Sequence, residues 1–234
     1  MTKKPCSDIP ARVAAVRARM ENAAAMAGHR AADITLVGVT KTQPAEAVRE
    51  LLLCGVTDIG ENRVQELLAK APLLADLPHR AHMIGHLQKN KAKLLPGCIS
   101  MLQSLDSADT AAALEKALVA AGCQLEVLIE VNIGGELSKS GVPAAGLPAL
   151  AERVLASDVL RLRGLMTIPP LCEGEKVRRY FEQMHALFVD IQAKNRDNTS
   201  INILSMGMSA DFEYAIREGA TMVRVGSDLF GPRR

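Results

Sequence analysis

The sequence is poor in several features that mark specialised classes of protein. It has no tryptophan, two tyrosines and four phenylalanines among 234 residues. Its five cysteines are scattered and never in CxxC spacing, which argues against a disulfide framework or a zinc knuckle (Cys6, Cys54, Cys98, Cys123 and Cys172). Isolated thiols in an odd number fit a reducing cytosol.

Charge of one sign and long apolar runs are also missing. Lysine and arginine number 28 against 26 aspartates and glutamates, and the net charge of +2 is too balanced for a dedicated nucleic-acid or membrane-surface binder. No apolar stretch reaches the ~18 residues of a membrane-spanning helix, and the N-terminus lacks the apolar region of a signal peptide. We therefore expect a soluble, unexported protein of the cytoplasm that binds neither nucleic acid nor membrane.

The composition that remains is typical of an ordinary folded protein. Hydrophobic residues make up 48% of the chain and charged residues 23%. A single α/β barrel commonly occupies about 200 to 250 residues, which matches the length of this chain. No linker or charge run divides the sequence, so residues 1–234 are expected to form one domain, with a leading helix within residues 1–30 packed on it.

Apolar runs of strand length alternate with segments of helical period along the chain. Strands are predicted over residues 34–40, 57–60, 82–85, 99–104, 125–132, 160–167, 201–205 and 221–225. Helices are predicted from residues 44, 62 and 88, over residues 107–121, 143–155 and 177–191, and from residue 209. A strand and a helix recurring every 24 residues or so, roughly the length of one unit with its two loops, predict a single (β/α)8 TIM-type barrel of the α/β class, to which the leading helix is an addition.

An open, doubly wound sheet is the competing fold. That fold commonly carries a GxGxxG turn after its first strand, where the backbone approaches a dinucleotide. This chain has Val39-Thr40-Lys41-Thr42 at that place, so the closed barrel is favoured.

Barrels of this kind place their sites at the carboxyl ends of the strands, so polar residues that follow the apolar runs are candidates for function. Lys41 follows the first run. A lysine at the mouth of an apolar barrel loses solvation, which favours the neutral amine that attacks an aldehyde, and this makes Lys41 a candidate Schiff-base lysine. The alternative is a solvated lysine at the end of a strand.

The segments that follow the seventh and eighth runs contain paired glycine and serine residues. Gly207 and Gly226 let the backbone approach a ligand closely, while Ser209 and Ser227 offer hydroxyl groups. Barrels often bind phosphate with these two loops, although Ser209 also fits a plain helix cap. A lysine that faces a phosphate cradle suggests a phosphorylated aldehyde, of which pyridoxal phosphate is the obvious example.

Seven motifs extend this pattern, in order, through residues 34–231. They are VGVTKT at 37–42, GENRVQE at 60–66, HMIGHLQ at 82–88, SKSG at 138–141, GLMTIP at 164–169, LSMGMS at 204–209 and VRVGS at 223–227. In these motifs the chain resembles the pyridoxal-phosphate homeostasis proteins of the YggS and PROSC type, which are single-barrel relatives of the N-terminal domain of alanine racemase.

The resemblance implies a role for each residue that matches it. Lys41 would hold pyridoxal 5'-phosphate as a Schiff base, and Ser209, Gly226 and Ser227 would surround the phosphate. Arg224 resembles the arginine that faces the pyridine nitrogen in alanine racemase. A guanidinium only donates hydrogen bonds, so the ring nitrogen would stay unprotonated and the ring would be a weaker electron sink.

Four further residues follow from the same resemblance. Asn62, His82 and Met206 would lie beside the ring or in the wall of the site. Lys139 matches a family lysine that receives or relays the cofactor, and its alternative is a mobile, solvated loop lysine.

Two positions depart from the family pattern, and neither touches Lys41. Ala81 stands where relatives commonly have tryptophan, which changes the packing beside the third strand. Asp228 adds a negative charge near the expected phosphate. His82 and His86 are four apart, but they flank a predicted strand end, and we expect no metal there.

Two functions from different classes follow from the resemblance. The favoured one is a non-catalytic carrier that stores, buffers or delivers pyridoxal phosphate, with PLP-dependent apoenzymes as recipients and a monomer as its expected state. The alternative is a small PLP-dependent racemase, which needs a second base such as tyrosine; Tyr180 and Tyr214 both fall in predicted outer helices. A phosphosugar-binding barrel without a Schiff base is a third interpretation.

Overall fold

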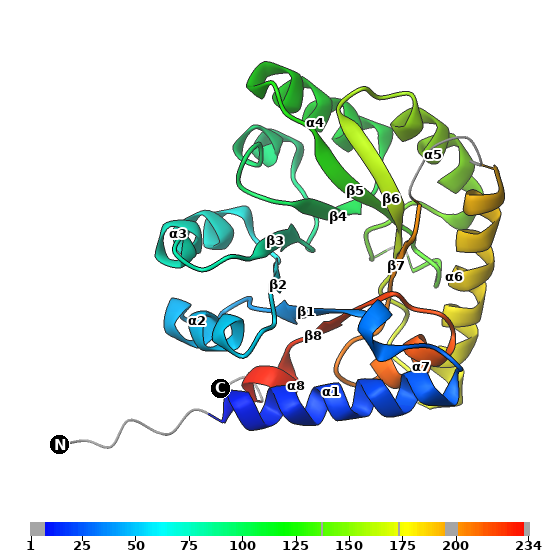
Figure 1. The fold of residues 1–234 in the computed structure, drawn as a ribbon. Helices are drawn as coiled ribbons and strands as arrows, with labels where there is room; N and C mark the ends of the chain where they lie inside the picture. The colour runs from blue at the N-terminus through cyan, green and yellow to red at the C-terminus, as the bar shows by residue number, and fades with distance from the viewer. Residues whose placement is uncertain (1–7, 137, 173, 195–200, 232–234) are drawn as a thin grey trace.

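The computed structural model describes residues 8–136, 138–172, 174–194 and 201–231 of the chain. Eight parallel strands close into a barrel in sequence order, and the last strand pairs with the first (Figure 1). The strands are β1 (Thr35–Val39), β2 (Asp58–Glu61), β3 (Arg80–Met83), β4 (Met101–Leu105), β5 (Leu125–Glu130), β6 (Leu160–Met166), β7 (Ile203–Ser205) and β8 (Met222–Val225). This architecture confirms the predicted (β/α)8 barrel, because the pairing of β1 with β8 excludes an open sheet.

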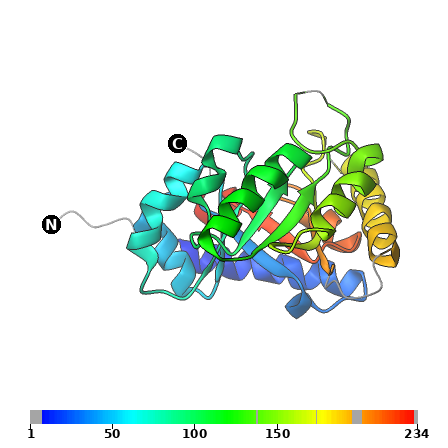
Figure 2. The same cartoon turned by 90° about the horizontal axis from the view of Figure 1, so that it is seen from above.

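Helices alternate with the strands and form an outer layer. The α-helices are α1 (Ile9–Met26), α2 (Ala45–Leu53), α3 (Val64–Leu74), α4 (Ala108–Ala121), α5 (Leu147–Leu155), α6 (Glu175–Lys194), α7 (Phe212–Arg217) and α8 (Ser227–Phe230). Three 3-10 helices complete the described elements: η1 (Ala31–Asp33), η2 (Lys89–Leu94) and η3 (Ala144–Gly146). Figure 2 shows the segment that follows β5 rising above this layer at one side of the barrel.

The leading helix α1 lies outside the eightfold repeat and packs against α7 and α8 (Figure 1). Its buried residues recur at helical spacing, from Ile9 through Val13 and Val16 to Met20, which is the apolar stripe expected of a helix with one covered face. The segment predicted as 1–30 is described from residue 8 onward, and Cys6 lies outside the described residues.

Several boundaries differ from the prediction. β3 was expected over 82–85, but its pairing with β2 starts two residues earlier, where the Arg80 N–H donates to the carbonyl of Thr57 at 2.9 Å. The helix expected from residue 88 is the short η2, in which Ala92 is the one buried residue, so it lacks an apolar stripe long enough for a regular helix. The four-residue α8 was not predicted.

Two layers of buried side chains stabilise the barrel. The larger lies between the strands and the helices. The smaller fills the interior of the barrel and consists of Val37, Met101, Leu128, Met166 and Met222. Polar side chains from β3, β4, β7 and β8 share this interior, and their hydrogen bonds are described below.

Candidate functional site

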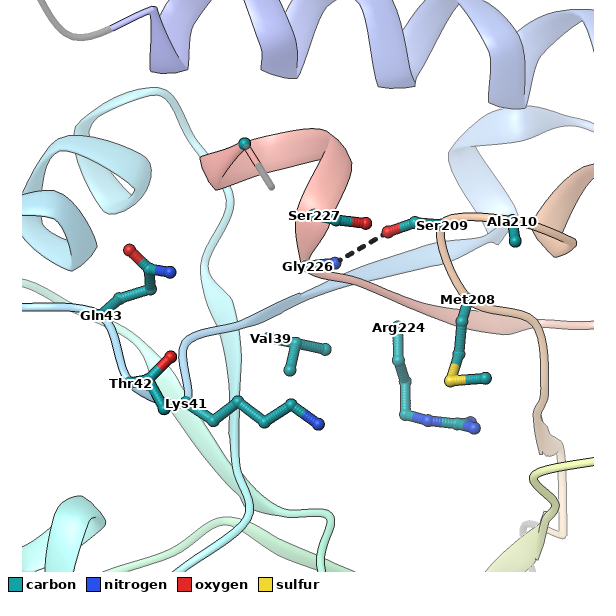
Figure 3. Close-up of a pocket in the computed structure, with 11 residues that line it drawn as sticks. Val39, Lys41, Thr42, Gln43, Met208, Ser209, Ala210, Arg224, Gly226 and Ser227 are labelled. Atoms are coloured by element: carbon teal, nitrogen blue, oxygen red, sulfur yellow. Dashed lines mark hydrogen bonds between the residues drawn. The ribbon is translucent and has the colours of Figure 1, made fainter. Parts of the chain in front are cut away.

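A cavity of about 250 Å³ opens at the carboxyl ends of β1, β7 and β8 (Figure 3). Its lining residues come from β1, from β8 and from the segments that follow β1, β7 and β8: Val39, Lys41, Thr42, Gln43, Met208, Ser209, Ala210, Arg224, Gly226, Ser227 and Gly231. Five of the nine residues selected from the sequence therefore meet in one place, namely Lys41, Ser209, Arg224, Gly226 and Ser227.

Lys41 stands just beyond β1, and its side chain extends toward Arg224 (Figure 3). The next residue, Thr42, has a φ of 64°, which is strained for a β-branched side chain and needs support from its surroundings. That support comes from α3: the Thr42 N–H donates to a carboxylate oxygen of Glu66 at 2.7 Å. On the other side of Lys41, the Thr40 carbonyl accepts from the Lys70 ammonium at 2.8 Å. The backbone around Lys41 is thus held at both flanks.

A buried ion pair anchors this arrangement. Lys70 donates to Glu61 Oε1 at 2.6 Å, and the Thr40 hydroxyl donates to the same oxygen at 2.6 Å. Burial raises the pKa of the Glu61 carboxyl, and the hydrogen bonds from Lys70 and Thr40 oppose that rise. The carbonyl of Thr40 and the carboxylate of Glu61 therefore share one ammonium group, which links the Lys41 loop to both β2 and α3.

The loops after β7 and β8 are joined through Ser209. Its hydroxyl oxygen accepts from the N–H of Gly226 at 3.2 Å (Figure 3) and from the N–H of Asp228 at 3.4 Å. Ser209 does not cap α7, since that helix begins after Asp211, whose carboxylate accepts from the Met208 N–H at 2.6 Å. The Ser209 hydroxyl thus joins the loop after β7 to the backbone of the loop after β8 at the wall of the cavity.

Arg224 is almost completely buried at the floor of the cavity, with 3% of its surface exposed. Its guanidinium donates to the Ser205 hydroxyl at 2.7 Å and to the Thr167 carbonyl at 2.9 Å. Burial lowers the pKa of Arg224 to about 10, against the opposing effect of Glu130, so the group stays charged at neutral pH. Burial likewise raises the pKa of Glu130 to about 7, and Asp106 adds to that rise.

The other four selected residues lie outside this cavity. Asn62 follows β2, where its backbone packs against Gly85. His82 and Met206 are both fully buried, His82 inside the barrel and Met206 in the larger hydrophobic cluster. Lys139 donates to the Pro169 carbonyl at 2.9 Å and pairs with Glu136 at 2.7 Å. It lines a second cavity of about 440 Å³ beside the β5 loop.

The charge of Asp228 is compensated within the structure. Arg19 of α1 donates to the carboxylates of Asp228 and Glu213, and its guanidinium lies 4.5 Å from the centre of the Phe212 ring. This arginine was not selected from the sequence, because its partners stand about 190 to 210 positions away along the chain.

Several lining residues were also missed. Met208 and Ala210 flank Ser209, and Thr42 and Gln43 follow Lys41. Their positions next to selected residues were the available signal, and the apolar side chains of Met208 and Ala210 carry no chemical pattern of their own.

None of the described helices is both long and apolar enough to cross a membrane. Within the same residues, no group of three or more histidine, cysteine, aspartate or glutamate side chains is placed to hold a metal ion.

The protein is thus a closed parallel barrel that carries a lysine after its first strand and paired glycine and serine residues after its last two strands. The model of the family described as alanine racemase, N-terminal domain, matches residues 12–234. The chain belongs to that family and, within it, to the pyridoxal phosphate homeostasis proteins.

Individual relatives support this membership over nearly the full length. The pyridoxal phosphate homeostasis protein of Aquifex aeolicus is 43% identical and the match covers 95% of this chain and 97% of the relative. An unknown protein from Bifidobacterium adolescentis has a structure that matches with a TM-score of 0.90 at 36% identity, over 95% of this chain and 94% of that chain. The structure of PipY from Synechococcus elongatus with PLP bound matches with a TM-score of 0.80 at 31% identity, over 95% of this chain and all of that chain.

Proposed function

We propose that this chain binds pyridoxal 5'-phosphate and holds it as a Schiff base on Lys41, as a protein of pyridoxal phosphate homeostasis that stores, buffers or delivers the cofactor. The observation that carries the proposal is the meeting of Lys41, Arg224 and the Ser209 and Gly226 loops around one cavity. The names of the relatives and the PLP bound to PipY support it.

The residues of the cavity fit the chemical groups of this cofactor. An amine, a guanidinium, two serine hydroxyls and backbone N–H groups make a donor-rich set, which suits an aldehyde, a ring nitrogen and a phosphate. When bound, the cofactor supplies an aldehyde that condenses with an amine and releases one water. Ser209, Gly226 and Ser227 would hold the phosphate, and Arg224 would donate to the ring nitrogen.

The roles of the four residues outside the cavity remain our proposals. Asn62, His82 and Met206 would support the wall of the site from neighbouring strands, and Lys139 would receive or relay the cofactor beside the β5 loop. The second cavity, which Lys139 lines with His86 and Asp106, supports a separate position for it.

A carrier role is favoured over racemisation. A two-base racemase needs a second base at the face of the ring opposite the lysine. Tyr180 and Tyr214 belong to the outer helices α6 and α7, and neither lines the cavity. The protonated Arg224 also favours an unprotonated ring nitrogen, which weakens carbanion chemistry. We further propose a single domain over residues 1–234, a monomer in the cytoplasm, and PLP-dependent apoenzymes as recipients.

Reduction with borohydride tests the proposal directly. Wild-type protein mixed with PLP should turn yellow, and reduction followed by peptide mass mapping should find one pyridoxyl group on Lys41. Lys41→Ala should stay unlabelled, while Lys194→Ala, which removes an exposed lysine on α6, should label like wild type. A second label on Lys139 at excess PLP would support its relay role.

Two results would overturn these assignments. A colourless, unlabelled wild-type protein would remove the Schiff base and favour a phosphosugar-binding barrel. Steady racemisation of an amino acid, absent from Lys41→Ala, would replace the carrier by an enzyme.

A further inference from the structure

A continuous chain of hydrogen bonds crosses the barrel interior beneath the candidate site. Five side chains form this interior chain: Arg224, Ser205, Gln103, His82 and Asp58. Arg224 lies at the floor of the cavity, whereas Asp58 is the first residue of β2 and lies toward the amino ends of the strands. All five residues are buried, with exposed fractions between 0% and 8%.

Each link of the interior chain has hydrogen-bonding geometry. The Arg224 guanidinium donates to Ser205 Oγ at 2.7 Å, and the Ser205 hydroxyl donates to Gln103 Oε1 at 2.7 Å. The Gln103 amide nitrogen lies 2.9 Å from His82 Nδ1. His82 Nε2 in turn lies 2.9 Å from Asp58 Oδ1. Each of the five side chains is therefore hydrogen-bonded directly to the next.

The two charged ends fix the direction of every bond. An ionised carboxylate only accepts, so His82 Nε2 carries the proton that faces Asp58. Burial works against that ionisation, but the hydrogen bond from His82 and the charge of Arg80 outweigh it and keep the pKa of Asp58 below its ordinary value. His82 Nδ1 is then the acceptor that the Gln103 amide requires. With its amide nitrogen facing His82, Gln103 presents its carbonyl oxygen to Ser205, so the Ser205 hydroxyl donates to Gln103 while its oxygen accepts from Arg224.

We propose that the interior chain orients the Arg224 guanidinium toward the ring of the cofactor, an inference that rests on the proposed function. A reversed Gln103 amide would set its carbonyl against His82 and its NH2 against Ser205, whose hydroxyl proton would then lose the Gln103 oxygen as its acceptor. That arrangement requires a second proton on His82. One direction satisfies all five groups and thereby fixes the Ser205 hydroxyl that accepts from Arg224. With the Thr167 carbonyl accepting from the second guanidinium nitrogen at 2.9 Å, the guanidinium is held in a single orientation. Ser205, Gln103, His82 and Asp58 are positioning residues, and they do not line the cavity.

Ligand selectivity gives the first test. PLP is compared with its 1-deaza analogue, in which a C–H group replaces the ring nitrogen. A hydrogen bond from a charged donor is worth enough for the wild-type protein to bind PLP about tenfold more tightly than the analogue. Gln103→Leu breaks the chain at its middle without touching the cavity, so this preference should fall to about twofold while affinity for the analogue is unchanged.

A matched control separates orientation from a general loss of packing. Ser104 neighbours Gln103 on β4, is fully buried, and donates to the Gly85 carbonyl at 2.6 Å. Ser104→Ala therefore removes a buried hydrogen bond outside the interior chain and should keep the wild-type preference for PLP.

A second measurement uses the cofactor-free protein. Nitrogen-15 NMR of the His82 ring should report a protonated Nε2 and an accepting Nδ1. Ser205→Ala, two links away from His82, should shift these resonances and also reduce the preference for PLP. This milder variant keeps the test decisive where Gln103→Leu fails to fold.

The outcomes distinguish a failure of the proposed function from a failure of the role given to the interior chain. Wild-type protein that binds no PLP overturns the proposed function. Wild-type protein that prefers PLP to the analogue, with the preference intact in Gln103→Leu and Ser205→Ala, overturns the role of the interior chain alone. Unchanged His82 resonances in Ser205→Ala would show that the chain does not couple its two ends.

Discussion

The shape of the loop after β7 depends on the backbone conformation of Gly207. Gly207 has a φ of 91°, and an added Cβ atom would lie 2.6 Å from Ala215 Cβ and 2.8 Å from Phe212 Cα. Its carbonyl accepts from the Arg224 N–H at 3.0 Å. Gly207 therefore has a left-handed conformation and packs closely against α7. Its carbonyl also forms a hydrogen bond with β8, the strand that carries Arg224.

Gly207→Ala should lower the free energy of unfolding by about 3 kcal/mol, because left-handed strain and a backbone clash add together. Gly97→Ala is the matched control, since Gly97 has a φ of 75° with open space around it and should cost only about 1 kcal/mol. Urea denaturation of both variants measures the difference. Equal losses would mean that contact with α7 contributes nothing.

At the scale of elements, α1 connects two helices that flank the candidate phosphate loops. Arg19 donates to Glu213 of α7 and to Asp228 of α8, and its NH2 group lies 3.5 Å from the Ser209 carbonyl. The carboxylate of Asp228 is 28% exposed and stands next to Ser227. Without its arginine, this negative charge would repel an anion in the cavity.

Arg19→Met should weaken PLP binding by about fivefold, since an unpaired charge near the phosphate costs roughly 1 kcal/mol at a partly exposed site. Arg17→Met is the control on the same helix, because Arg17 donates to the Gly55 carbonyl and lies beside the segment that leads into β2. Spectroscopic titration at low salt and at 1 M salt measures both effects. The defect should shrink at high salt, and a defect shared by the two variants would contradict this role.

The elements themselves were largely predictable, because apolar runs and helical stripes are local patterns. All eight strands lie at or within two residues of the predicted starts, and the lining residues after β1, β7 and β8 follow from the rule that barrels bind ligands at strand ends. The partners of His82 were not predictable: Asp58 and Gln103 lie 24 and 21 residues away, on the two strands that flank β3. Such contacts depend on the register of the closed barrel, which no local pattern encodes.

At the scale of the whole molecule, one buried carboxyl makes stability depend on pH. Glu130 ends β5 with 6% of its surface exposed, and burial raises its pKa from 4.5 to about 7. Because the pKa of Glu130 is higher in the folded protein than in the unfolded chain, its protonated carboxyl contributes stability that is fully present at pH values below the unfolded pKa. This contribution is lost as the pH rises through about 7.

Glu130→Gln should therefore gain stability relative to wild type between pH 5 and pH 8, by at most about 3 kcal/mol, since one pKa unit corresponds to about 1.4 kcal/mol. Urea denaturation across this range measures the gain. Glu115→Gln is the control: the hydrogen bond from Arg153 lowers the pKa of Glu115 below its ordinary 4.5, so its contribution is lost only at lower pH and its difference from wild type should be flat between pH 5 and pH 8. A flat difference between Glu130→Gln and wild type would refute the prediction.

The pairing of β1 with β8 also governs when the site can exist. Leu36 lies opposite Val223, so the first and last strands meet only when the barrel closes. A ribosome that has released β1 through β7 has already made Lys41, but the strand that carries Arg224 is still to come. The cavity therefore forms only once β8 has been made and has paired with β1, and capture of its ligand can mark a closed barrel but cannot guide an open one.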